Sequence, residues 1–167
     1  VGLAVGAGPA CDFLPPAGKS TRLTEALAVL GRVRPAGRGS VSALLTRLVE
    51  RVRRRGLIVL VSDFFEDLEP LGSALRFARY HNHEIIAFQV LTEAELSFPY
   101  AVQTNFVDSE TGERVVSEPR AVRSEYMRLL NGHNQALRDV CEQCEADLVS
   151  LSTGDSLADV LTAYLAR

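Results

Sequence analysis

Cysteine is scarce in this chain, which excludes a fold built on disulfide bonds. The 167 residues include three cysteines, at positions 11, 141 and 144. An odd number without the spacing of a disulfide framework indicates reduced thiols, so we expect a cytoplasmic protein. The pair Cys141-Glu-Gln-Cys144 could bind zinc or act in redox chemistry. It lies in a helical pattern without a second pair, however, so we interpret both thiols as parts of one helix face.

Long hydrophobic runs and an excess of positive charge are also missing. No apolar run approaches the roughly 20 residues that span a bilayer, so we expect no transmembrane segment. The formal net charge of -3 argues against general nucleic-acid binding. Eight arginines nevertheless lie between positions 32 and 55. Because arginine near a helix C-terminus complements the helix dipole, we interpret them as a solvated helix end, with an acidic partner as the alternative.

The start of the chain lacks the features of a secretory signal. Val1 is not an initiator methionine, and residues 1–6 read as a strand without the charged start and cleavage site of a signal peptide. We therefore expect a fragment of a longer protein. Its 167 residues suit one domain, residues 1–167.

Residues 57–62, Leu-Ile-Val-Leu-Val-Ser, give the clearest strand signal, and Asp63 follows them directly. Apolar side chains without alternation are typical of a strand that is buried on both faces in the centre of a parallel sheet. Ligands of open α/β sheets bind at the carboxyl ends of the strands, so Asp63 is the candidate functional residue. We predict burial for six side chains of this run and the next one: Leu57, Val59, Val61, Ile85, Ile86 and Phe88.

Strand and helix patterns alternate along the chain, which predicts a doubly wound α/β fold with a mostly parallel sheet. The predicted strands cover residues 1–7, 12–14, 57–62, 84–91, 104–108, 113–116 and 147–151. The predicted helices cover residues 23–30, 41–52, about 66–82, 119–144 and 157–165. Residues 1–14 form a hairpin at a sheet edge in this prediction, and residues 104–116 form an inserted hairpin. We expect the apolar faces of the last two helices, which include Leu129 and Leu161, to point into the core.

The patterns that would indicate catalysis are incomplete. Ala17-Gly-Lys-Ser-Thr21 resembles the end of a P-loop, but Phe13 stands where that loop needs a glycine. Gly6-Ala-Gly8 lacks the third glycine of a dinucleotide fingerprint. The histidines lack neighbouring metal ligands: His81, His83 and His133. No nucleophile pairs with a base, so we predict no catalytic residue and no enzymatic activity.

Four stretches together resemble one protein family. They are the strand that ends at Asp63, the segment Leu91-Thr-Glu-Ala-Glu-Leu-Ser-Phe-Pro99, the segment Phe106-Val-Asp-Ser-Glu-Thr-Gly112 and the C-terminal Ala-Tyr-Leu-Ala-Arg. On these the chain is identified, over essentially its whole length, as a member of the bacterial and archaeal family called domain of unknown function 58. The resemblance implies a von Willebrand factor A-like, Rossmann-like fold. It also implies a protein-binding role alongside a MoxR-type AAA+ ATPase.

The same resemblance implies a metal-ion-dependent adhesion site (MIDAS) for Mg²⁺ or Mn²⁺. Such a site combines an Asp-x-Ser-x-Ser loop, a Thr from a second loop and an Asp from a third. Asp63 matches the third-loop Asp, and Gly39 falls at the Thr position with the Ser40 hydroxyl beside it. The first loop and its central strand have no match here. We therefore expect a degenerate site that binds metal weakly, two unpaired strand edges and poor solubility.

Asp63 permits two other interpretations. A strand-end aspartate suits Mg²⁺-dependent phosphoryl transfer, as acceptor or metal ligand. Phe65, however, occupies the position of the second aspartate of haloacid-dehalogenase-like enzymes. The other interpretation is that Asp63 only caps the turn after the strand.

Overall fold

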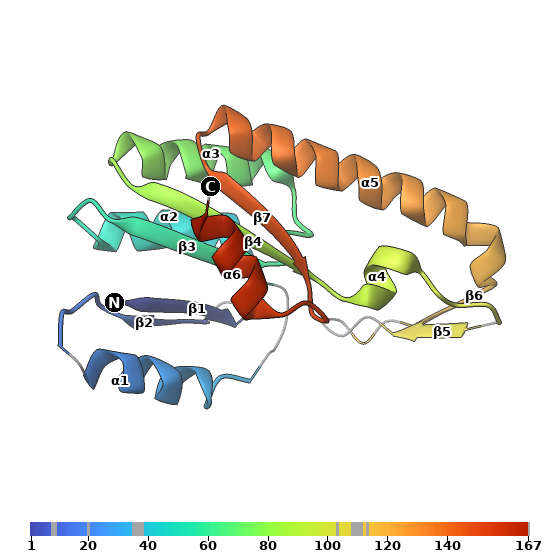
Figure 1. The fold of residues 1–167 in the computed structure, drawn as a ribbon, viewed down its shortest axis with the longest axis horizontal. Coiled ribbons are helices and arrows are strands. Elements are labelled where there is room, and N and C mark those ends of the chain that lie inside the picture. The colour runs from blue at the N-terminus through green and yellow to red at the C-terminus, as the bar shows by residue number, and fades with distance from the viewer. Residues whose placement is uncertain are drawn as a thin grey trace.

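A three-stranded parallel sheet flanked by helices forms the centre of the molecule (Figure 1). The computed structural model describes residues 1–7, 10–19, 21–34, 39–102, 104–107, 112 and 114–166. The helices and strands are β1 Leu3–Ala7, β2 Ala10–Leu14, α1 Thr21–Leu30, α2 Val41–Arg51, β3 Leu57–Ser62, α3 Leu68–Tyr80, β4 Glu84–Leu91, α4 Glu93–Ser97, β5 Thr104–Val107, β6 Arg114–Ser117, α5 Pro119–Gln143, β7 Asp147–Ser152 and α6 Leu157–Leu165. The predicted α/β class is confirmed, and the arrangement is compatible with a Rossmann-like fold.

The central strand of this sheet is β4, and β3 lies at its edge. The strand order is β3-β4-β7, and both pairs are parallel. The prediction that β3 is the central strand is therefore wrong. Its burial alternates, because Ile58 and Leu60 face the core while Leu57, Val59 and Val61 are 56%, 50% and 68% exposed. Of the six side chains predicted to be buried, only Ile85 and Phe88 are buried, and Ile86 is half-buried.

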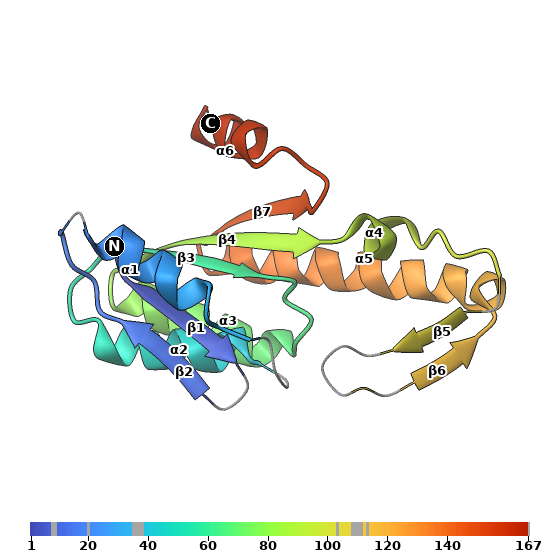
Figure 2. The same cartoon turned by 90° about the horizontal axis from the view of Figure 1, so that it is seen from below.

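One face of the sheet packs on three helices. Figure 2 shows α2, α3 and α5 on one side of the sheet and α6 on the other. Buried leucines of the three helices meet the inward side chains of β3 and β4. This core contains Leu45, Leu71, Leu75, Leu137, Ile58, Leu60, Ile85 and Ala87. Burying an aliphatic side chain contributes about 1.5 to 3 kcal/mol, so this face supplies most of the apolar stabilisation.

Local signals explain where the core helices begin. The Ser40 side chain accepts a hydrogen bond from the Ala43 amide and caps α2. Asp67 caps α3 in the same way through the Glu69 amide. Pro119 occupies the first turn of α5, where its missing N–H costs nothing.

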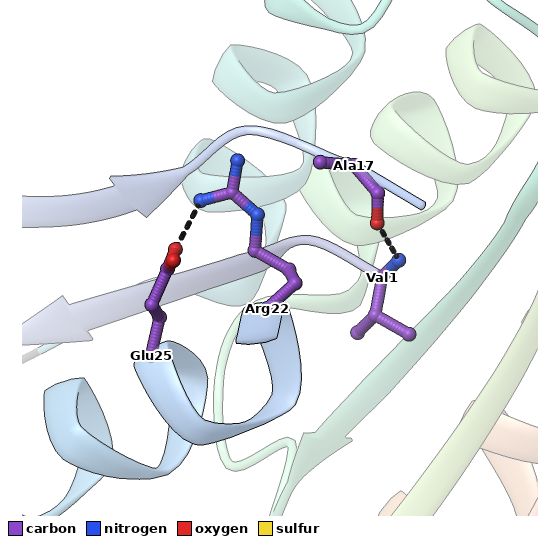
Figure 3. Close-up of polar contacts among 4 residues, drawn as sticks. All are labelled: Val1, Ala17, Arg22 and Glu25. Atoms are coloured by element: carbon purple, nitrogen blue, oxygen red, sulfur yellow. Dashed lines mark hydrogen bonds and ion pairs between the residues drawn. The ribbon is translucent and has the colours of Figure 1, made fainter. Parts of the chain in front are cut away.

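The N-terminal hairpin forms a sheet of its own. β1 and β2 pair antiparallel, from Leu3↔Leu14 to Ala7↔Ala10, and they form a separate two-stranded sheet. The hairpin was predicted at a sheet edge, with the central strand of the family missing between it and residues 57–61, and within the described residues it pairs with no strand of the main sheet. Beyond the paired strands, the Val1 nitrogen donates to the Ala17 carbonyl at 2.9 Å (Figure 3), and the Ala17 amide donates back to the Val1 carbonyl at 3.1 Å. The same figure shows the Arg22–Glu25 ion pair of α1, at 2.7 Å.

The inward orientation predicted for the last two helices is only partly correct. In α5, Leu130, Leu137 and Cys141 are buried, but Leu129 is 56% exposed. None of the described side chains of α6 is buried, and Leu161 is partly exposed. An edge-to-face contact between Tyr164 and Phe88 ties α6 to the sheet. Amphipathic periodicity identified both helices, but it did not show whether another element covers the apolar face.

The predicted inserted hairpin is confirmed in its strands. β5 and β6 pair antiparallel, from Thr104↔Ser117 to Val107↔Arg114. Gly112 has φ +73°, a left-handed conformation that glycine adopts without strain, while residues 108–111 lie outside the described part. No helix in the described part of the chain combines the length and the apolarity that crossing a bilayer requires.

Candidate functional site

Asp63 lies exposed in the loop that leaves the carboxyl end of β3. Its Oδ1 accepts hydrogen bonds from the Phe65 amide at 3.1 Å and from the Ser62 hydroxyl at 3.4 Å. The bond to the amide two residues on is the pattern by which aspartate stabilises a turn. Asp63 therefore does cap the turn. Its role as a metal ligand stays a prediction.

The backbone of this loop is held in an uncommon conformation. Phe64 has φ +58°, and its side chain is 1% exposed. For a bulky residue the left-handed region costs of order 1 to 3 kcal/mol, and it persists only where the surroundings impose it. His133 Nε2 donates to the Phe64 carbonyl at 2.9 Å, and the Phe64 amide donates to Ser62 Oγ at 3.1 Å. These contacts and the buried ring fix the loop.

A buried glutamine connects the loop to α5 and to β7, the strand at the opposite edge of the sheet. Gln89, on β4, is 1% exposed. Its Nε2 donates to Asn134 Oδ1 at 2.9 Å and more weakly to the Asp63 carbonyl at 3.4 Å, and its Oε1 accepts from Ser150 Oγ at 3.0 Å. The network joins β3, β4, β7 and α5 at the carboxyl ends of the strands. Sequence analysis did not identify Gln89, although one amide in an apolar strand is a visible signal.

Ser40 lies beside the same loop through Glu66. The hydroxyls of Ser40 and Ser42 donate to Glu66 Oε2 at 2.9 and 3.1 Å, and the Ser42 amide donates to Oε1 at 3.1 Å. Glu66 thus ties the start of α2 to the segment after Asp63. The Ser40 hydroxyl donates to Glu66 and accepts from the Ala43 amide at the start of α2, and its role as a metal ligand stays a prediction.

The described residues do not complete a cation site. Among them, no group of three or more His, Cys, Asp or Glu side chains could hold a metal ion. Mg²⁺ needs near-octahedral oxygen coordination, and Asp63 with Ser40 supplies one carboxylate and one shared hydroxyl. The two predicted ligands therefore do not suffice by themselves.

The cysteine pair belongs to the core. Both Cys141 and Cys144 are buried and free, and Cys144 Sγ lies 3.6 Å from the Gly72 carbonyl. Burial, with a smaller effect of Cys144, raises the pKa of Cys141 to about 11. A thiol with this pKa carries almost no thiolate near neutral pH, so it is a poor nucleophile and metal ligand.

A cavity opens next to the Asp63 loop, between α4, β5 and the first half of α5. Its volume is about 600 Å³. Six ring side chains line it: Phe65, Phe98, Tyr100, Phe106, Tyr126 and His133. Thr92, Ala94, Glu95, Leu129 and Leu130 complete the lining. We call this cavity the aromatic groove. Phe65 and His133 connect it to the Asp63 loop, with ring centroids 5.6 Å apart.

Four of the six rings of the aromatic groove form a packed cluster around Phe98. The Phe98 centroid lies 4.6 Å from that of Tyr126, 5.2 Å from that of Tyr100 and 5.7 Å from that of Phe106. Phe98 ends α4 in the left-handed conformation, with φ +46°. Offset and edge-to-face ring contacts add about 0.5 to 1.5 kcal/mol each beyond burial. The walls of the groove are therefore well ordered by their own contacts.

The polar groups of the groove gather at its α4 end. Glu95 closes a capping box in which its Oε2 accepts from the Thr92 amide and hydroxyl, at 2.6 and 2.9 Å. Tyr126 donates its hydroxyl proton to the Glu95 carbonyl at 3.0 Å. Burial, the Glu95 carboxylate and Tyr100 together raise the pKa of Tyr126. Sequence analysis missed both α4 and the groove, although Thr92-Glu-Ala-Glu95 carries the capping-box pattern.

Comparison with known proteins gives a family and no function. A family profile described as "Protein of unknown function DUF58" matches residues 1–136. Uncharacterized proteins of Mycobacterium bovis and Mycobacterium tuberculosis are each 30% identical over 136 residues, which is 80% of this chain and 42% of each relative. An uncharacterized protein of Mycobacterium avium is 26% identical over 150 residues, covering 87% of this chain and 86% of that protein. The chain thus spans under half the length of the first two relatives. No solved structure shows significant similarity.

Proposed function

Because this chain belongs to the DUF58 family, we propose that it is a cytoplasmic protein-interaction module, not an enzyme, and that it acts with a MoxR-type AAA+ ATPase. Family membership alone gives neither the partner nor the compartment, so each has its own ground. The ATPase is the partner that the family resemblance implies, and the free thiols of α5 favour a reducing compartment.

The observation that carries the proposal is the exposed apolar side of β3. Leu57, Val59 and Val61 are each at least half exposed, on the face of the sheet opposite the three core helices. The outer edge of β3 pairs with no strand among the described residues, as expected where the central strand of the family has no match in this chain. The support therefore comes from the side chains, because contiguous exposed apolar surface marks interaction sites.

Binding of the chain to a MoxR-type ATPase of the same organism tests this proposal. Biolayer interferometry with immobilised chain should show saturable binding of the ATPase. Val61→Lys should weaken it at least tenfold, because a buried unpaired ammonium is costly. Val102→Lys, on a loop and 75% exposed, is the matched control and should bind like the original chain. Absence of binding by the original chain, or equal binding by Val61→Lys, would contradict the proposal.

The metal site that we propose is degenerate, with Asp63 and Ser40 as its remaining ligands for Mg²⁺ or Mn²⁺. Water would have to fill most of an octahedral shell, and Mg²⁺ releases its hydration reluctantly. Isothermal titration should therefore show no saturable binding of either ion below millimolar concentration. A longer chain that supplies an Asp-x-Ser-x-Ser loop should bind Mg²⁺ or Mn²⁺ saturably in that range. Micromolar Mn²⁺ binding by this chain that disappears in Asp63→Ala would show the ligand set to be different.

A phosphoryl-transfer enzyme is the second candidate, favoured by the exposure of the Asp63 carboxylate at a strand end. A phosphoenzyme would form when Asp63 attacks a phosphoryl donor and releases the leaving group. Acetyl phosphate separates the two functions. We expect no hydroxylamine-sensitive phosphate on the chain. Stoichiometric labelling that is lost in Asp63→Asn would favour the enzyme.

A further inference from the structure

The aromatic groove is open to solvent and is larger than one side chain. Its volume of about 600 Å³ lies within the range of about 300 to 1,000 Å³ that is typical of ligand sites. Leu129 is 56% exposed and Tyr100 is 36% exposed at its surface. Both views of the ribbon show α4 beside the first half of α5, with β5 near the same end (Figures 1 and 2). An occupant of more than one side chain can therefore enter from solvent.

The groove presents side chains to an occupant but few free backbone N–H and C=O groups. Its walls come largely from two helices, and the Leu96 and Phe98 amides of α4 donate to the Thr92 and Ala94 carbonyls. An added strand needs free backbone N–H and C=O groups along its path, whereas an amphipathic helix binds through apolar side chains about one turn apart. The geometry therefore favours a helix over an extended segment.

The charge of the groove lining indicates which charge the polar face of a bound helix should carry. Glu95 is the acidic residue of the lining, and the lining contains neither Lys nor Arg. Its carboxylate accepts the bonds from Thr92 through Oε2, and within the described part of the chain Oε1 receives no hydrogen bond. The aromatic rings beside it attract cations through their faces. A Lys or Arg side chain complements this end of the groove.

We propose that the aromatic groove binds a basic amphipathic helix of a protein partner, with two apolar side chains among the rings and a Lys or Arg beside Glu95. This inference rests on the proposed function, since it gives the partner of the module a second contact surface besides the apolar side of β3. Phe65 and His133 belong both to the groove wall and to the support of the Asp63 loop. The partner helix would thus lie next to Asp63.

Two synthetic helical peptides test the charge preference. Both are Ala-rich and carry Leu and Phe at positions i and i+4, and they differ in bearing Arg or Glu at i+7. Fluorescence anisotropy of the labelled peptides should show saturable binding of the Arg peptide, about threefold to tenfold tighter than that of the Glu peptide. Glu95→Gln should remove this difference. Glutamine can still close the capping box, so the variant changes the charge and keeps α4.

A matched pair of leucines tests the location. Leu129→Ser, in the groove, should weaken the affinity for the Arg peptide at least fivefold. Leu157→Ser, on α6 and similarly exposed at 60%, should leave its affinity unchanged. Equal affinities in the two variants, an unaltered preference in Glu95→Gln, or no response to either peptide would each overturn the inference. Saturable binding of 4-phenylbutanol without any peptide response would assign the groove to a small apolar ligand and overturn it as well.

The ATPase assay keeps the two proposals apart. If the groove is a docking site for the ATPase, Leu129→Ser should also weaken binding of the ATPase, and Leu157→Ser should not. If the original chain binds the ATPase while Leu129→Ser binds it equally well, the groove inference fails and the proposed function stands. If the original chain does not bind the ATPase, the proposed function fails, whereas peptide binding still reports on the groove.

Discussion

Gln89 is the side chain that links the Asp63 loop to both α5 and β7. Its amide satisfies Asn134 and Ser150 and reaches the Asp63 carbonyl from the central strand. Gln89→Leu would remove these hydrogen bonds, each of which contributes about 0.5 to 1.5 kcal/mol net. Because Asn134 is only half-buried and Ser150 is exposed, water can replace part of what they lose. We therefore expect a loss of about 1 to 3 kcal/mol in urea unfolding. Gln135→Leu on exposed α5 is the control and should change stability by less than about 0.5 kcal/mol.

A second prediction at the scale of residues concerns Cys141 and pH. Burial raises the pKa of the Cys141 thiol to about 11, so the folded state keeps the proton at a pH where the unfolded state loses it. The contribution of the protonated Cys141 thiol to the free energy of unfolding is therefore complete below pH 9 and is lost as pH rises through about 11. Unfolding midpoints measured between pH 8 and pH 11 should decrease across this window. Cys141→Ala should show a smaller decrease. An equal decrease in both proteins would assign the effect to other groups.

Strand β3 shows what an apolar run can and cannot predict. The run predicted a strand and its end at Asp63 correctly, since backbone propensity and the following turn are local properties. It did not predict burial, because an unbroken apolar sequence does not show whether a second layer covers both faces. The alternation of exposed Val59 with buried Leu60 is set by α2 and α3, which lie on one side.

A matched pair of valines tests this assignment of β3. On sequence alone, Val59→Ala is predicted to cost roughly 1 to 4 kcal/mol, but the half-exposed side chain removes most of that cost. We now expect less than about 1 kcal/mol for Val59→Ala and about 1 to 3 kcal/mol for Val149→Ala, which is 8% exposed on β7. Chemical denaturation of both variants measures the difference. A larger loss at Val59 would restore β3 as a strand buried on both faces.

At the scale of the whole molecule, the sequence predicted the order of elements better than their environment. The α/β class, the parallel pairs and both hairpins follow from local periodicity and from the handedness of crossovers. The edge position of β3 and the aromatic groove depend on contacts between residues far apart in sequence. Phe65 and Phe106, for example, line one cavity although α3, β4 and α4 lie between them in the sequence. Local pattern carries little information on such contacts.

The exposed apolar surface also predicts how the chain behaves in solution. Leucines at positions 23, 27 and 30 of α1 and 157 and 165 of α6 are at least half exposed, as are the outward side chains of β3. With an unpaired β3 edge, the isolated chain should self-associate as its concentration rises. Val61→Lys should shift this association to higher concentration, because a charge on an edge strand opposes pairing. Val102→Lys makes the same change of net charge on a loop, so it separates the edge effect from general repulsion. Sedimentation velocity across a concentration series measures both variants. If they associate like the original chain, β3 is not the contact surface.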